Sequence, residues 1–164
     1  MNKKHTLSLL AVISSLITFA QEQKHRLSLV SDLDAEIVTE ETRPITLGIQ
    51  YQYSLTERQN LSAFFAVSNK ISYFGADYVY DFPLVGNKLE FNLGGGMGLY
   101  KYNTPPSIGI DYDPKEWYLA GTVGFTYNFS AQPLSIFAAY KPKIDSAFDP
   151  VGPTDMFVGI GYRF

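Results

Sequence analysis

The residues of this chain that could do chemistry are few, and their types and spacing favour no catalytic site. The sequence has two histidines and no cysteine, so thiol nucleophiles and thiolate metal sites are excluded. Hydrolysis or acyl transfer by a serine requires a base beside the nucleophile, and no His-x-Ser sequence occurs. His25 stands at the start of an expected strand, where we interpret it as an interfacial polar residue. We therefore predict no catalytic residue and no enzymatic activity.

Aspartates gather in two of the expected loops, where they could in principle bind calcium. Neither loop has the ordered ligand spacing of a known calcium motif, and the neighbouring prolines indicate turns, in which aspartate is common. We predict solvated turn residues, with neither a metal site nor a cofactor, at Asp111, Asp113, Asp145, Asp149 and Asp155.

The run GGGMG at residues 94–98 has the composition of a phosphate-binding loop. It lies inside an expected strand rather than between a strand and a helix, so phosphate binding lacks its structural context. We expect Gly94, Gly96 and Gly98 to face inward, where they leave room for bulky neighbours or allow strong strand curvature.

The elements that position all these residues are strands, because apolar and polar side chains alternate along the chain. In residues 44–56 (PITLGIQYQYSLT) every second residue is apolar. Successive side chains of a strand point to opposite sides, so this segment has one apolar and one polar face. The same period, weakest in the first segment, predicts further strands near residues 26–33, 61–68, 73–82, 88–99, 116–129, 134–141 and 155–164.

The predicted strands number eight, and most are near the ~9–11 residues that a tilted membrane-crossing strand needs. Their connections alternate in length, apart from a tight link at Asn69-Lys70. Short turns followed by longer loops are typical of an outer-membrane barrel, with the turns on the periplasmic side. An even number of strands then places both termini on that side. The short turns are 57–60, 83–87 and 130–133, and the longer loops are 34–43, 102–115 and 144–153.

The composition of the two faces indicates which face meets lipid. The polar faces are rich in Gly, Ser, Thr, Ala, Asn and Gln, which suit the narrow interior of eight strands. The apolar faces carry almost no charge at the strand centres. We predict an all-β fold, an eight-stranded antiparallel up-and-down transmembrane β-barrel, although alternation alone also fits a soluble barrel with an aromatic core.

Aromatic residues on the apolar faces fall near the strand ends, where an outer-membrane barrel has its two belts. We expect a periplasmic belt of seven residues and an outer belt that contains the remaining two. In that order they are Tyr53, Tyr80, Phe82, Tyr127, Phe129, Tyr162 and Phe164, then Trp117 and Tyr140.

Charged residues on the inward faces form two layers, which would need pairing in a poorly solvated interior. We predict a lumen plugged by ion pairs, because an aqueous channel belongs to barrels of about 16 strands or more. A proton or ion pathway is the alternative. The periplasmic layer is Arg26, Asp81, Lys88, Glu90 and Arg163, and the outer layer is Asp32, Glu116, Lys141, Lys143 and Asp155.

The N-terminal residues have the three-part layout of a secretory signal peptide. Lys3 and Lys4 form the basic segment, residues 7–19 the apolar segment, and Thr18-Phe19-Ala20 a cleavage site. The apolar run is too short for a spanning helix, which needs about 20 residues. We expect residues 1–20 to be the signal peptide and residues 21–164 to form one outer-membrane β-barrel domain.

Charge argues against a nucleic-acid partner. The chain has 13 basic and 16 acidic residues and a formal net charge of −3, and loss of Lys3 and Lys4 with the signal peptide makes it more acidic. Nucleic-acid-binding domains are instead typically basic.

Gly159, Tyr162 and Phe164 have the spacing G-x-x-aromatic-x-Phe, which resembles the C-terminal targeting signal of bacterial outer-membrane proteins. In that family the barrel assembly machinery reads this signal, so the resemblance implies that machinery as a partner during insertion. The chain after the signal peptide resembles the small eight-stranded barrels of the OmpA-transmembrane-domain and OmpX type. Lipid A acylases and deacylases on similar barrels use His with Ser and an acid, a set that is not matched.

From these observations we expect a structural or interaction role in the outer membrane, as a subunit of an envelope complex. We expect outer-membrane lipid to surround the barrel. Apolar residues in the longer loops suggest a protein partner that binds on the outside of the membrane. The alternatives are a narrow conduit for a small apolar molecule and, less favoured, a lipid-modifying enzyme.

Overall fold

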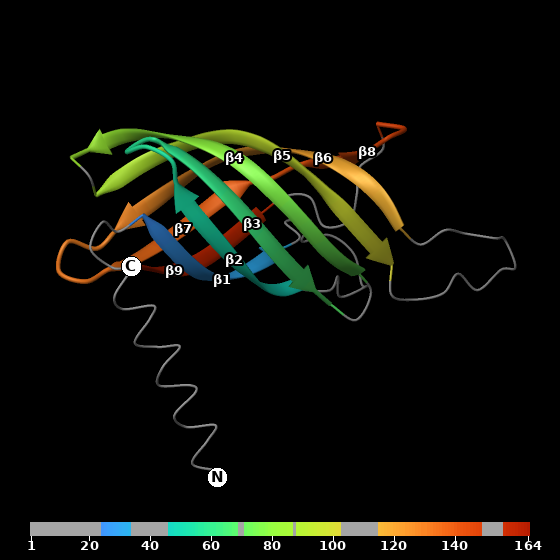
Figure 1. Cartoon of the computed structure of the whole chain (residues 1–164), viewed down its shortest axis with the longest axis horizontal. Coiled ribbons are helices and arrows are strands. Elements are labelled where there is room, and N and C mark those ends of the chain that lie inside the picture. Colours follow the sequence, from blue (N-terminus) through green and yellow to red (C-terminus); the bar gives the residue numbers. More distant parts are fainter. Residues whose placement is uncertain (1–23, 34–45, 69–70, 87, 103–114, 149–155) are drawn as a thin grey trace, which may run out of the picture.

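The computed structural model describes residues 24–33, 46–68, 71–86, 88–102, 115–148 and 156–164 (Figure 1). Within these ranges the chain forms strands, and no helix there is long and apolar enough to cross a membrane. The expected signal peptide lies outside them. The strands are β1 His25–Leu33, β2 Thr46–Ser54, β3 Gln59–Val67, β4 Ile71–Val85, β5 Leu89–Tyr102, β6 Lys115–Asn128, β7 Leu134–Tyr140, β8 Lys143–Asp145 and β9 Met156–Arg163.

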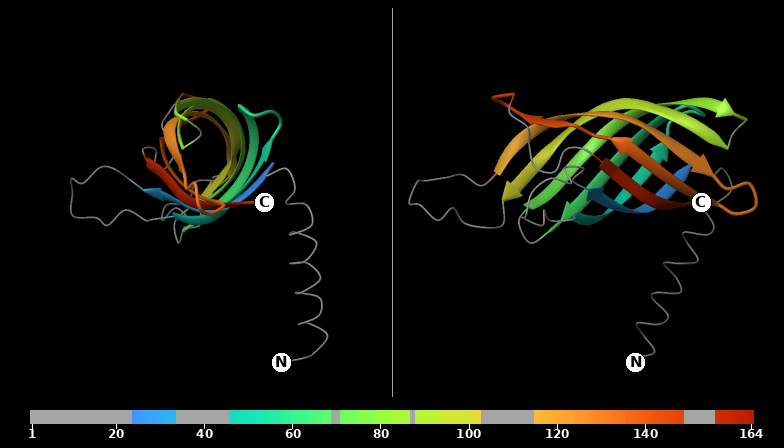
Figure 2. Two further views of the ribbon diagram at one scale, coloured as in Figure 1. Left: turned by 90° about the vertical axis from the view of Figure 1, so that its left-hand side faces the viewer. Right: turned by 180° about the vertical axis from the view of Figure 1, so that it is seen from behind.

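The strands form one closed antiparallel sheet. Each strand from β1 to β6 pairs with the next, β6 pairs with β7 and β8, and β9 pairs with both β7 and β1. The final contact joins His25 to Phe164, whose backbone N–H and C=O groups bond in both directions at 3.0 and 2.8 Å. Seen along its axis, the strands form a ring (Figure 2, left), and the interior of this ring is here called the bore. Among the described residues, every strand except the short β8 pairs on both of its sides, and β8 pairs with β6 alone. The sheet therefore offers few of the unpaired edges that promote aggregation.

Strands β7 and β8 act as one strand of the barrel, which therefore has the predicted eight. The pairs Val123↔Tyr140 and Ala120↔Lys143 share one register with β6. Pro142 lies between them and cannot donate to the ladder, but its carbonyl accepts a hydrogen bond of 3.1 Å from the N–H of Gly121. The strand thus continues to Asp145, beyond the loop start expected at residue 144.

The two ends of the barrel differ. The turn end contains the start of β1, the end of β9 and the turns 55–58, 86–88 and 129–133, and the loop end is opposite (Figure 1). At the turn end β4 runs to Val85, so most of the turn expected at residues 83–87 is strand. The register shifts between Pro83 and Val85, and Gly86 supplies the turn with a φ of 55°, a value that glycine adopts at little cost.

The predicted faces are confirmed, and they are the reverse of those in a soluble protein. In β3, Asn60, Ser62 and Phe64 are buried in the bore while Leu61 and Phe65 are exposed outside. Most large apolar side chains of the other strands are likewise exposed outside, although some, such as Ile71, Tyr118 and Phe157, are buried in the bore. Leu29, Leu47 and Trp117 have exposed fractions of 65%, 67% and 63%, respectively.

Inward glycines allow the close approach of side chains inside the bore. A Cβ at Gly98 would lie 2.3 Å from the carbonyl oxygen of Phe74 and 2.5 Å from the hydroxyl oxygen of Tyr118. Gly95, on the outward face of the same strand, is different. A Cβ there would meet only the carbonyl oxygen of Ala120, at 3.1 Å.

We expect Gly98→Val to lower the free energy of unfolding by about 1–3 kcal/mol, because it overpacks the bore. Gly95→Val is the matched control, and we expect it to change that free energy by less than about 0.5 kcal/mol. The measurement is urea unfolding of the folded protein in detergent, followed by the fluorescence of Trp117, the single tryptophan. Equal losses in the two variants would contradict this account of the glycines.

Candidate functional site

The candidate site is the bore, because charged side chains from several strands project into it. Its loop half is filled by aromatic rings and two buried lysines, and its turn half opens into a polar cavity, here called the vestibule. The vestibule has a volume of about 780 Å³, whereas the next space toward the loop end has about 40 Å³.

Lys141, at the junction of β7 and β8, extends across the bore to β4. Its Nζ lies 2.5 Å from Oδ2 of Asp77, and both side chains are buried. The same Nζ lies 3.6 Å from the ring centroid of Phe64 and 4.6 Å from that of Phe157. A carboxylate and two aromatic faces thus surround the ammonium group, an arrangement favourable to a desolvated cation. Gly96 makes room for Asp77, whose Oδ1 would lie 2.3 Å from a Cβ at that position.

Lys143, in β8, forms a second pair nearer the loop end. Its Nζ lies 2.5 Å from Oδ2 of Asp32 in β1 and 5.0 Å from the ring centroid of Tyr73. The backbone N–H of Asp32 donates to Oγ1 of Thr46 at 3.1 Å. Both lysines are 1% exposed, so each ammonium group depends on its carboxylate for compensation.

Aromatic rings fill the space around the two pairs. Phe157 contacts Phe64 and Phe137 at centroid distances of 5.6 and 6.1 Å, and Tyr118 meets Tyr73 edge-on at 6.1 Å. Tyr100 completes the group and donates a hydrogen bond of 2.8 Å to Oε2 of Glu116. The described part of the loop half is therefore packed with side chains.

A polar network separates this packed half from the vestibule. Asp81 accepts hydrogen bonds from Nδ2 of Asn60 at 2.6 Å and from Nδ2 of Asn92 at 2.8 Å. Asn92 in turn accepts a bond of 2.8 Å from the Thr126 hydroxyl. Neutral amide groups therefore satisfy both oxygens of this carboxylate.

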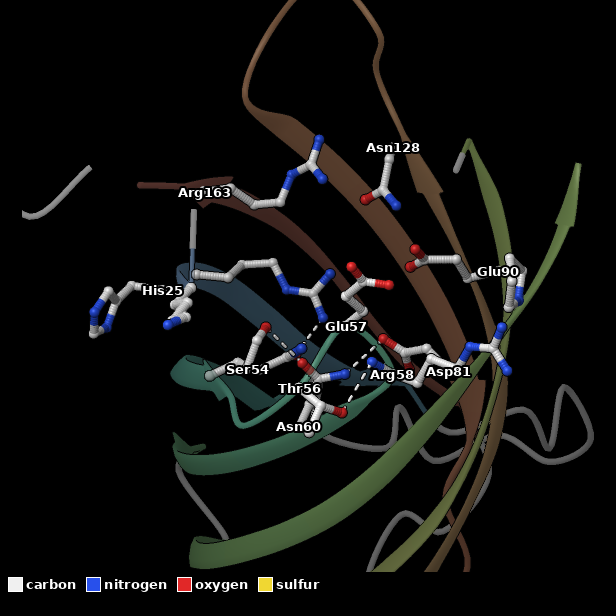
Figure 3. Close-up of a pocket in the computed structure, with 14 residues that line it drawn as sticks. His25, Ser54, Thr56, Glu57, Arg58, Asn60, Asp81, Glu90, Asn128 and Arg163 are labelled. Carbon is white, nitrogen blue, oxygen red and sulfur yellow. Dashed lines mark hydrogen bonds between the residues drawn. The ribbon is translucent and has the colours of Figure 1, made fainter. Parts of the chain in front are cut away.

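The vestibule lies at the turn end and is lined by β1, β2, β3, β4, β5, β6, β9 and the turn between β2 and β3 (Figure 3). Arg163, Asn128 and Glu90 project into it from β9, β6 and β5. Arg26 reaches Oε1 of Gln52 in β2, and its other terminal nitrogen lies 3.5 Å from the Ser135 hydroxyl. The vestibule therefore brings guanidinium and carboxylate groups of different strands into one cavity.

The charged residues named from the sequence divide between these regions. Arg26, Asp81, Glu90 and Arg163 line the vestibule, and Asp32 pairs with Lys143. Lys141 pairs with Asp77, which the alternation placed on an inward face but which was not among the candidates. Lys88 differs, because it lies exposed in the turn before β5, and Asp155 lies outside the described residues.

The aromatic residues expected in the two belts all project outward or lie at the turn end. One of them, Tyr140, does not lie at the end of the barrel where it was expected. Trp117 lies at the loop end, two residues after the start of β6. Tyr140 does not lie beside it, because β8 extends the strand past Tyr140, which pairs with Val123 near mid-height. At the turn end, Tyr127 contacts Phe129 and Tyr80 contacts Phe82 at centroid distances of 5.1 and 4.7 Å.

The residues of the expected targeting signal all belong to the closing seam. Gly159 faces inward against Phe137, whose ring atom Cζ would lie 2.4 Å from a Cβ there. Tyr162 faces outward and is 52% exposed. Phe164 pairs with His25 through its backbone, and their rings stack at 5.6 Å.

Neither a catalytic dyad nor a metal centre is formed by the residues that the structure describes. His25 borders the vestibule, but its imidazole ring projects away from the cavity (Figure 3), and its Nδ1 lies 2.6 Å from the hydroxyl oxygen of Tyr51. The described ranges contain no group of three or more His, Cys, Asp or Glu residues arranged to hold a metal ion.

No protein-family model and no curated protein sequence matches this chain. Several solved structures match its fold. The N-terminal β-barrel domain of Pseudomonas aeruginosa OprF aligns with a TM-score of 0.63 and 15% identity, over 85% of this chain and 96% of that one. A de novo designed transmembrane β-barrel aligns with a TM-score of 0.55 and 13% identity, over 85% and 94% of the two chains.

The outer-membrane protein Ail of Yersinia pestis, determined in a phospholipid nanodisc, aligns with a TM-score of 0.54 and 16% identity, over 85% of this chain and 98% of that one. At such low identities the likeness establishes the fold alone. The chain has the fold of the small eight-stranded outer-membrane β-barrels, as the sequence predicts.

We expect Asp77→Asn to lower the free energy of unfolding by about 3–5 kcal/mol, because it leaves the Lys141 ammonium group buried without a counter-charge. The double variant Asp77→Leu/Lys141→Met removes both charges, and we expect it to recover most of that loss. Lys101→Met, at an exposed site on β5, should change stability by no more than about 0.5 kcal/mol.

Guanidinium-induced unfolding in detergent measures all three variants. A double variant as unstable as the single variant would show that the ion pair is not what makes Asp77 important.

Proposed function

We propose that this chain is an integral protein of the bacterial outer membrane, with an occluded lumen and a structural or interaction role, as a subunit of a larger envelope complex. The observation that supports membrane residence best is the outward apolar face of every strand. Leu29 on β1, Leu47 on β2 and Trp117 on β6 are more than three-fifths exposed. A continuous surface of this kind far exceeds the few hundred Å² of apolar patch that a soluble monomer tolerates.

The distribution of charge supports the same proposal. Lys141, Lys143, Asp32 and Asp77 all point into the bore, whereas a charge on the lipid face would cost about 2–4 kcal/mol at the bilayer midplane. The turn end then faces the periplasm, together with the start of β1 and the end of β9. Gly159, Tyr162 and Phe164 lie at the seam that the barrel assembly machinery would meet during insertion.

Occlusion of the lumen is inferred from its contents. The side chains of Lys141, Phe64 and Phe157 meet in the middle of the bore, and the adjoining space of about 40 Å³ has room for only a few water molecules. A conduit for an apolar molecule finds little support, because charged and amide groups line the vestibule. A lipid-modifying activity finds little support either, because His25 contacts aromatic residues and projects away from the bore.

Partners are proposed on chemical grounds. Outer-membrane lipid would cover the apolar surface, and the longer loops at the loop end would contact a protein partner outside the cell. Isolation from mild detergent and identification of co-purifying chains would identify such a partner.

We expect Leu29→Arg to lower the free energy of unfolding in phospholipid vesicles by about 2–4 kcal/mol, because Leu29 is central in β1 and would hold a charge in hydrocarbon. Leu84→Arg replaces an equally apolar, exposed residue near the turn at 86–88 and should cost only about 0–1 kcal/mol. Guanidinium titration in vesicles measures both. Equal, small effects would argue against a lipid-facing β1.

We expect the protein to produce no stable conductance steps in planar bilayers, because its bore is packed. A porin with about 16 strands, whose bore is aqueous, is the positive control. Reproducible steps from the purified protein would refute occlusion while leaving membrane residence intact.

A further inference from the structure

We propose that the vestibule binds a small oxyanion, a phosphate or carboxylate group, between the guanidinium groups of Arg26 and Arg163. The two arginines are direct register partners across the β1–β9 seam. Both face inward, as do Ser28 and Gly161 two residues along their strands. Like charges on directly opposed residues of neighbouring strands destabilise a sheet. An anion between them would turn this repulsion into two attractions.

The position of Arg26 is fixed by its neighbours. A Cβ at Gly161 would lie 2.9 Å from both Cγ and Cδ of Arg26, so the glycine leaves space for the arginine stem. The guanidinium group then reaches Gln52 on one side and Ser135 on the other. Both acceptors are neutral oxygens, so neither bond neutralises the charge of Arg26, which Asp81 and Glu90 attract without forming an ion pair with it.

Two of the three carboxylates that line the vestibule, Asp81 and Glu90, are hydrogen-bonded to neutral side chains. Both oxygens of Asp81 accept bonds from asparagine amides, and Glu90 has a side-chain hydrogen bond with Asn128. Neither Arg26 nor Arg163 forms an ion pair with a carboxylate of the described residues. The Nε atoms of both arginines are buried and have no acceptor within that same part of the chain.

The vestibule thus has an excess of hydrogen-bond donors, since each guanidinium group carries five N–H donors and no acceptor. Its lining also contains more basic than acidic side chains, with Lys24, Arg26, Arg58 and Arg163 against Glu57, Asp81 and Glu90. The whole chain has the opposite balance, at −3. The formal charge of the lining is therefore +1, opposite in sign to that of the whole chain.

The shape of the site indicates a small ligand. The volume of about 780 Å³ leaves room for an anion with its water, but Lys141 and the rings of Phe64 and Phe157 close the bore beyond it. A ligand would enter and leave by the turn end alone. Guanidinium groups bind phosphate and carboxylate oxygens in a bidentate manner, which favours an oxyanion over a halide.

The test is an NMR titration of the full-length folded protein in octyl glucoside, a detergent without phosphate. Inorganic phosphate is added at constant ionic strength, and the Nε–Hε signals of Arg26 and Arg163 are followed. We expect both signals to shift and to saturate. Acetate, titrated in the same way, distinguishes a site for carboxylates from one for phosphates, and saturation by either anion supports the proposal.

The variants separate a built site from general attraction. We expect Arg163→Gln to raise the Kd for phosphate by about tenfold, the loss of one charge-assisted contact. Arg163→Lys keeps the charge but not the planar fork, and should lie between this variant and the wild type. Lys101→Gln removes the same charge at the loop end and should change the Kd by less than about twofold.

Two results would overturn the proposal. One is the absence of saturation in the wild-type Arg26 and Arg163 signals up to about 100 mM phosphate and acetate, a range that excludes specific affinity. The other is an equal change in Kd for Arg163→Gln and Lys101→Gln. The wild-type signals decide the matter even if Arg163→Gln fails to fold.

The source of the anion is identified in nanodiscs without added phosphate or acetate. If phosphatidylglycerol discs produce the saturated arginine shifts, the ligand is a lipid headgroup. If the shifts appear only after dissolved anion is added, the ligand is a soluble anion. Both results support the oxyanion site, and absence of the shifts under every condition counts against it.

Discussion

The width of the bore is the constraint on which the rest of this structure depends. Eight tilted strands close around a space just wide enough for side chains, so every inward residue must fit against residues of strands that are not its neighbours. Small residues such as Gly96 and Gly98 are therefore as necessary as the bulky groups they accommodate, Asp77 and Tyr118. The outward faces have no such restriction, and large apolar side chains stand there at nearly every second position.

The same confinement explains why the two lysines matter to the architecture. A buried ion pair is weak evidence for stability, since apolar residues of equal volume often do as well. A buried ion pair does make the fold more specific, because a buried ammonium group is tolerated only in an arrangement that places a carboxylate beside it. Lys141 with Asp77 joins the β7–β8 junction to β4, and Lys143 with Asp32 joins β8 to β1. These contacts connect strands that share no backbone hydrogen bond, and they favour one arrangement of the barrel.

Much of the fold could be predicted from the sequence, because it depends on the alternation of apolar and polar residues, which is visible within each strand by itself. The number of strands, the direction in which each face points and the inward position of Gly94, Gly96 and Gly98 all follow from it. The partners across the bore could not be predicted, because they depend on the stagger between distant strands. Asp77 was thus missed as the partner of Lys141, although the alternation of side chains had placed it on the inward face of its strand. Tyr140 was placed too near the loop end, because the strand expected at residues 134–141 continues to Asp145.

Closure of the sheet through β1 and β9 has a kinetic consequence. These strands lie at opposite ends of the described chain, yet they are hydrogen-bonded neighbours. The contact of greatest sequence separation is thus the one that completes the ring, and such contacts form slowly. Until it forms, two bare edges remain available for pairing with other molecules. A nascent polypeptide of this topology must therefore be kept apart from its own copies until its final segment has arrived.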